Sequence, residues 1–99
     1  MVLERDLQKR CVKYAKKHGF WCSKFVAQGR RSVPDYIFAH KNEFEYANIF
    51  FVEFKRAGEK PTEQQKAKHE EMRAFGIRVY VIDNYENFVT LIHDIKEHG

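Results

Sequence analysis

The amino-acid sequence predicts one α/β domain over residues 1–99, with a four-stranded mixed sheet flanked by helices. Apolar residues recur at helical spacing near both ends of the chain. Between them lie three successive runs rich in aromatic and β-branched residues, which favour strands. A further helical segment then separates the third run from a fourth apolar run. The expected order of elements is therefore α-β-β-β-α-β-α.

The first helix is expected to begin near Leu3 and to end at Gly19. Its apolar face is formed by residues that recur at steps of three and four: Leu3, Leu7, Cys11, Tyr14 and His18. Charged residues fill its other faces, and glycine is common just after the end of a helix. We therefore expect an amphipathic helix here.

Three strands are expected at 20–27, 33–39 and 48–55, where aromatic and β-branched residues are frequent. Pro34 can open the second strand, because a proline at the first strand position removes no central ladder bond. The run 49–52 is apolar throughout, which indicates burial on both faces. The polar segment before the third strand is expected to be a hairpin connection, so the three strands can form an antiparallel meander.

The second half of the chain is predicted to run helix, strand, helix. Thr62 and Gln65 fit the capping box that opens a helix, and Gly76 follows that helix. A fourth strand is expected at 77–82, and a last helix follows Asn84. Because a helix separates the third strand from the fourth, these two strands should be parallel.

Composition places the chain among soluble globular proteins. Its residues are 43% hydrophobic and 15% aromatic, and no apolar run approaches the length that spans a membrane. We therefore expect an intracellular protein with no membrane association. The two cysteines are isolated and indicate neither a zinc site nor a disulfide. The histidines show no ligand spacing and are expected at the surface or in packing: His18, His40, His69, His93 and His98.

Basic residues are concentrated in the N-terminal third of the chain, within a formal net charge of +4. They are Arg5, Lys9, Arg10, Lys13, Lys16, Lys17, Lys24, Arg30 and Arg31. This part of the chain is suited to face phosphates. A merely solvated basic helix explains the charge equally well, so charge alone does not identify a partner.

Three charged residues lie within apolar strand segments: Asp35, Glu53 and Lys55. Strand side chains alternate between faces, so Glu53 and Lys55 share one side and Phe54 takes the other. If the two strands pair, Asp35 comes close to Glu53. Two converging carboxylates repel unless a cation intervenes, and Mg2+ is a hard ion that prefers such oxygen ligands. A structural ion pair between Lys55 and one acid is the alternative explanation.

The order Val33-Pro34-Asp35, then Glu53-Phe54-Lys55, resembles the PD-(D/E)xK nuclease superfamily. Further residues make the chain most similar to the virus-type replication-repair nuclease (VRR-NUC) family, in the stand-alone form that phages encode. These further residues are Gly29, Thr62 with Gln65, and Gly76. The chain departs from the family pattern at Ser32, where glycine is usual, and at helix positions that are usually apolar: Lys68, His69 and Met72.

The resemblance implies a restriction-endonuclease-like core and a metal-dependent endonuclease acting on DNA. Asp35, Glu53 and the backbone carbonyl of Phe54 would hold Mg2+ or Mn2+, and Lys55 would be the catalytic lysine. The ion would activate water for attack on a phosphodiester bond. The products would carry 5′-phosphate and 3′-hydroxyl ends, and no small-molecule cofactor is expected.

Two further residues have competing roles. Glu4 matches an acid on the first helix of many members, where it ligates a second ion directly or through water. An acid in the first turn of a helix also simply complements the helix dipole. Gln65 matches a glutamine that borders the site, and helix capping is its alternative role.

We expect DNA to be held by basic residues near the site: Arg30, Arg31, Lys9, Lys13 and Lys24. Contacts to the DNA backbone carry no sequence information, so cleavage should depend on DNA structure, with a Holliday junction or other branched DNA as substrate. A homodimer would place two sites across a four-way junction. A phage-encoded form would act in the host cytoplasm. The alternatives are a non-catalytic nucleic-acid-binding module with this fold and an interaction protein with a structural ion pair.

Overall fold

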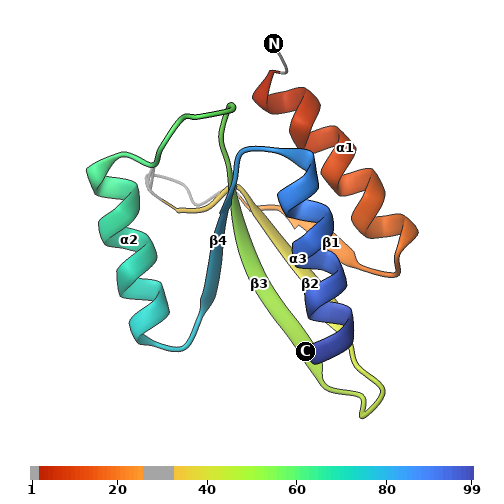
Figure 1. Ribbon diagram of the computed structural model, residues 1–99. Coiled ribbons are helices and arrows are strands. Elements are labelled where there is room, and N and C mark those ends of the chain that lie inside the picture. The colour runs from red at the N-terminus through yellow and green to blue at the C-terminus, as the bar shows by residue number, and fades with distance from the viewer. Residues whose placement is uncertain (1–2, 26–32) are drawn as a thin grey trace.

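The computed structural model describes residues 3–25 and 33–99, and its elements follow the predicted order (Figure 1). They are α1 (Glu4–Lys17), β1 (Trp21–Lys24), β2 (Tyr36–Lys41), β3 (Ala47–Phe54), α2 (Glu63–Ala74), β4 (Arg78–Ile82) and α3 (Tyr85–His98). The predicted end of the first strand and the loop that follows it lie outside the described residues. No helix in the described ranges is long and apolar enough to cross a membrane.

The four strands form one sheet in the order β1-β2-β3-β4. β2 is antiparallel to both β1 and β3, whereas β3 and β4 are parallel, as the helix between them predicts. β2 begins at Tyr36, later than position 33. The reason is local: Pro34 has no N–H to donate, and the side chain of Asp35 accepts the Phe54 N–H at 2.9 Å.

The core lies between the sheet and the helices α1 and α3, which cover the same face of the sheet (Figure 1). The rings of Phe38 and Phe50 stack across β2 and β3 with centroids 5.4 Å apart, and Phe88 of α3 lies 5.4 Å from Phe38. α1 contributes buried residues at helical spacing: Leu7, Cys11 and Ala15. Aromatic side chains each bury a large apolar area, so this cluster is a major source of hydrophobic stabilisation.

α2 packs against the opposite face of the sheet, on its β4 side (Figure 1). Side chains of β3 that point to this face differ in burial. Ile49 is 49% exposed, whereas Glu53 is 3% exposed. The expectation of burial on both faces throughout 49–52 is therefore wrong at Ile49. A helix is about 10 Å across and strands lie about 4.8 Å apart, so one helix covers about two of the four strands.

Candidate active site

Asp35 and Glu53 lie on neighbouring segments at the same end of the sheet. The last ladder pair between β2 and β3 joins Tyr36 to Val52, so Asp35 and Glu53 are the next two residues in register. The Asp35 carboxylate accepts the Phe54 backbone N–H at 2.9 Å, which orients it toward β3. The antiparallel pairing therefore brings together two acids that are distant in sequence.

The buried side chain of Glu53 has a strongly shifted pKa. Burial is the main cause, followed by repulsion from Asp35 and a hydrogen bond between the two carboxyl groups, and together they raise the pKa of Glu53 to about 8. Lys55 opposes this shift with a smaller effect. The carboxyl group of Glu53 therefore keeps its proton near pH 7. A divalent cation bound here would replace that proton.

Lys55 is buried, and its ammonium group pairs with neither acid of the cluster. Its Nζ lies 3.7 Å from Oε1 of Glu59, and no ion pair within 4.0 Å links it to Asp35 or Glu53. The alternative explanation was an ion pair between Lys55 and Asp35 or Glu53, but Lys55 pairs with Glu59 instead. Sequence reasoning missed Glu59 because segment 56–60 was expected to be a loop, where residue spacing does not predict contacts.

Glu4 lies in the first turn of α1, within electrostatic reach of the cluster. Burial is the largest cause that raises the pKa of Glu4, and Asp35 raises it further, while Lys55 lowers it. Gln8 donates to the Glu4 carboxylate from the next turn at 3.4 Å. α1 therefore brings a third carboxylate toward Asp35, a proximity that an interaction with the helix dipole alone does not require.

Gln65 forms the predicted capping box at the start of α2. Its backbone N–H donates to Thr62 Oγ1 at 3.1 Å, and its Oε1 accepts the Thr62 N–H at 2.9 Å. The capping role is confirmed, and a role at the site stays a prediction. Phe54 has its ring in the core and its backbone N–H at the cluster, so its carbonyl also stays a predicted ligand.

His69 is a neighbour of the cluster that sequence reasoning missed. Its side chain is buried, and its Nε2 lies 3.7 Å from Oε1 of Glu53. The expected role of His69 as a surface or packing residue therefore omits this contact with the cluster. Burial is the main cause that lowers the pKa of His69, Arg73 and Lys55 lower it further, and Asp35 opposes them. Spacing offered a signal, because His69 follows Gln65 by four residues and shares its face of α2.

The residues of the cluster fit a divalent cation through their unsatisfied atoms. Within residues 3–25 and 33–99, no group of three or more His, Cys, Asp or Glu side chains is already arranged to enclose an ion. Glu53 Oε1 and His69 Nε2 are nevertheless both buried without a hydrogen-bond partner. Carboxylate oxygens suit Mg2+ and Mn2+, and a cation would satisfy the free Glu53 oxygen. The donor chemistry is therefore present.

Two adjoining hollows beside α1 and the start of α3 form what we call the basic groove. The hollow next to Lys55 has a volume of about 280 Å3 and the second a volume of about 300 Å3. Both are lined by Arg10 and Tyr85, and the Arg10 guanidinium lies 4.0 Å from the centroid of the Tyr85 ring. Lys13 and Lys17 line the second hollow. The first hollow is also lined by Asp83 and Glu86, so the positive charge of the groove is concentrated on its α1 side.

The predicted DNA-binding residues fall in different places. Lys13 lies in the basic groove, and Lys9 is exposed elsewhere on α1. Lys24 is exposed at the end of β1. Arg30 and Arg31 lie outside the described residues. The sequence therefore identified α1 as basic, whereas the structure selects which of its side chains line a groove.

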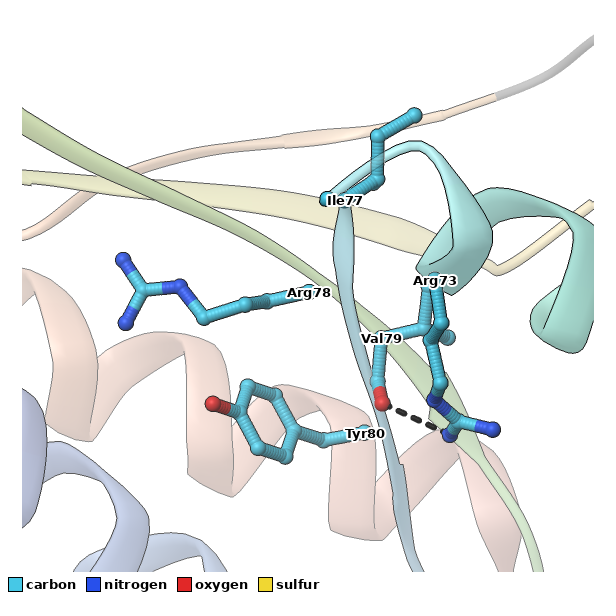
Figure 2. Close-up of a pocket in the computed structure, with 6 residues that line it drawn as sticks. Arg73, Ile77, Arg78, Val79 and Tyr80 are labelled. Carbon is cyan, nitrogen blue, oxygen red and sulfur yellow. Dashed lines mark hydrogen bonds between the residues drawn. The ribbon is translucent and has the colours of Figure 1, made fainter.

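A separate cavity of about 280 Å3 lies at the start of β4, where Arg73 of α2 faces the strand (Figure 2). The Arg73 guanidinium donates to the Val79 carbonyl at 2.8 Å, which satisfies a backbone group at the edge of the sheet. β4 pairs with β3 so that Arg78 is opposite Phe50 and Val81 is opposite Glu53, and Arg78 at this cavity is therefore about 10 Å along the strand from the position of Glu53. It is not part of the candidate active site.

Comparisons with known proteins identify relatives over nearly the whole chain. No family model matches it. A protein described as "Putative nuclease p44", from Acyrthosiphon pisum secondary endosymbiont phage 1, is 38% identical over 86 residues, which cover 87% of this chain and 88% of that protein. A solved structure described as a VRR_NUC domain has a TM-score of 0.78 and 27% identity, and the match covers 91% of this chain and 94% of that one.

Proposed function

This chain belongs to the VRR-NUC family of nucleases, and we propose that it is a divalent-metal-dependent DNA endonuclease with its centre at Asp35, Glu53 and Lys55. The observation that supports this best is the pair of carboxyl groups of Asp35 and Glu53, of which Glu53 is buried. Glu53 keeps its proton near pH 7, and its Oε1 has no hydrogen-bond partner although a buried lysine is nearby. A purely structural cluster would use Lys55 to satisfy that oxygen, whereas Lys55 pairs with Glu59.

Each residue of the cluster has a distinct part in the proposed reaction. Asp35 and Glu53 would hold Mg2+ or Mn2+, and the Phe54 carbonyl and Glu4 would be further ligands. The ion, when bound, supplies polarisation of the phosphate and lowers the pKa of the attacking water. Glu53 would have to lose its proton to hold the cation, and the Phe54 N–H keeps Asp35 oriented. Lys55 orients the water and offsets negative charge that develops on the phosphate.

The basic groove is the proposed path of the DNA backbone away from the site. Its positive side chains come from one face of α1, and the first hollow includes Lys55 itself. Cations arranged this way contact phosphates and position the strand without reading its sequence. We therefore propose selectivity for DNA structure, with a Holliday junction or other branched DNA as substrate.

Replacing Lys13 and Lys17 together by glutamine is expected to weaken DNA binding and to reduce its salt dependence. Each lost phosphate contact lowers the slope of log affinity against log salt by about 0.9, so the double variant should lose about 1.8. The matched control replaces two exposed lysines outside the groove, Lys41 and Lys66, and removes the same charge. Binding titrations at several salt concentrations measure both slopes. An equal loss in the two double variants contradicts the proposed path.

The proposed activity is tested with purified protein and four DNAs: a four-way junction, a flap, a linear duplex and a single strand. Cleavage with Mg2+ or Mn2+ and none with EDTA is expected, with the junction cut fastest. Cleavage that persists in EDTA contradicts the metal mechanism. Binding without cleavage favours a non-catalytic nucleic-acid-binding module, and neither binding nor cleavage favours an interaction protein. Light scattering on the same sample tests the proposed homodimer, which a monomer mass contradicts.

A further inference from the structure

Two buried polar atoms from different elements face each other at the cluster without a partner. They are Oε1 of Glu53 on β3 and Nε2 of His69 on α2, and they lie 3.7 Å apart. The side chains that carry them are 4% and 1% exposed, so solvent does not satisfy either atom. Burying a polar atom without a partner destabilises a fold, and such atoms are rare in proteins. Two that face each other indicate a missing common partner.

The spacing of the two atoms discriminates between possible partners. A direct hydrogen bond is excluded, because 3.7 Å exceeds the range of N–H···O bonds. A bridging water, at about 2.8 Å from each atom, would have to bind them at an acute angle. Two ligands of one metal ion, each about 2.1 Å from it, lie up to about 4.2 Å apart. The observed 3.7 Å lies between about 3.0 Å for two ligands at a right angle and about 4.2 Å for two opposite ligands, so the side chains must shift slightly to ligate one ion.

We propose that His69 Nε2 is a direct ligand of the divalent ion held by Asp35 and Glu53, so that the site combines an imidazole nitrogen with carboxylate oxygens. This proposal rests on the function proposed above and adds a ligand to it. Helix α2 supplies the nitrogen from the opposite side to the strands that supply the oxygens. The capping box at Thr62 and Gln65 fixes where α2 begins, and it therefore sets the position of His69 one turn further on.

A mixed set of nitrogen and oxygen ligands has a consequence for metal choice. Mg2+ takes oxygen ligands and keeps several waters, so a neutral imidazole offers it little. Divalent transition metals accept imidazole readily. The ligand set of Asp35, Glu53 and His69 therefore favours a transition metal such as Mn2+ over Mg2+ more strongly than two carboxylates alone.

The ligand is detected without any measurement of cleavage. Mn2+ is bound to the full chain, and pulsed electron paramagnetic resonance is recorded for wild type, His69→Leu, His69→Gln and His98→Asn. Wild type is expected to show the coupling of a directly bound nitrogen, and this coupling should vanish in both His69 variants. His98 is exposed at the end of α3, so His98→Asn should keep the coupling. Labelling histidine with 15N should change the wild-type coupling, which tests the assignment even where a variant fails to fold.

Affinity gives a second readout on the same samples. His69→Leu is expected to bind Mn2+ at least about tenfold more weakly, with Mg2+ affinity within about threefold of wild type. Equal losses for both ions, or nitrogen coupling that persists in the His69 variants, overturn the proposal. Suppose that Mn2+ binds wild type but not Asp35→Asn, and that wild type shows no nitrogen coupling. This result overturns His69 as a ligand and leaves the proposed metal-dependent function in place. Absence of any Mn2+ binding to wild type overturns the proposed metal-dependent function as well.

Discussion

Replacing Lys55 by methionine is expected to lower the rate of DNA cleavage by about a thousandfold while DNA affinity changes by only a few fold. Lys55 is buried, and its charge acts on the carboxyl group of Glu53, so it is placed to act on a phosphate bound at the two acids. A positioned group that moves protons or stabilises charge contributes about a hundred- to ten-thousandfold to rate. Single-turnover cleavage with Mn2+, together with a binding titration, measures the two effects separately.

The choice of methionine keeps the test independent of folding. The stem of Lys55 is packed, and methionine replaces its volume without the charge, whereas alanine would leave a void. Glu59→Gln is the matched control, because it removes the partner of Lys55 and leaves its charge in place. That control should change the rate by less than about tenfold. A Lys55→Met protein that folds and cleaves at the wild-type rate contradicts the catalytic role.

Replacing Glu53 by glutamine is expected to lower the rate of DNA cleavage by more than about a thousandfold. The same change should also reduce the dependence of the protein's stability on pH. Glutamine lacks the negative charge that binds a cation, so the site loses a ligand. In the metal-free wild type, the folded-state pKa of Glu53 is about 8, against an ordinary value of 4.5. The folded state therefore holds a proton that the unfolded state has lost, at any pH between these two values.

The sign of the stability effect follows from this difference. Where the folded state binds more protons than the unfolded state, the free energy of unfolding decreases as pH rises. In EDTA, wild type should therefore lose stability from about pH 4.5 to about pH 8, and Glu53→Gln should lose less. At pH 8.5 the variant should melt several degrees above wild type. Melting curves at five pH values test this, and parallel pH profiles for the two proteins contradict it.

Saturating Mn2+ provides an internal control for the second prediction. A bound cation would offset the negative charge that Glu53 carries once its proton is lost, so it should restore the stability of wild type at pH 8.5. Glu53→Gln has lost the charge that binds the ion, and its melting temperature should respond little. If Mn2+ raises both melting temperatures equally, the ion binds elsewhere on the protein.

Much of the fold and part of the site follow from the sequence because they depend on local or periodic patterns. Alternation along β3 correctly separates Phe54, which packs in the core, from Glu53 on the other face. The capping box at Thr62 and Gln65 is read within four residues, and it forms as expected. The helix between two strands predicts their parallel pairing. The pairing of Asp35 with Glu53 needed one further assumption, that the second and third strands are adjacent.

The sequence by itself therefore determined the order of elements and the parallel pairing of β3 with β4, and it identified the acids that meet once β2 and β3 are neighbours. Only the tertiary structure decided what surrounds those acids. The approach of His69 to Glu53 depends on how α2 lies across β3 and β4, and the pairing of Lys55 with Glu59 depends on a loop path. The exposure of Ile49 likewise reflects how far α2 extends over the sheet. These contacts join segments without a common period, so packing, rather than pattern, sets their distances and their burial.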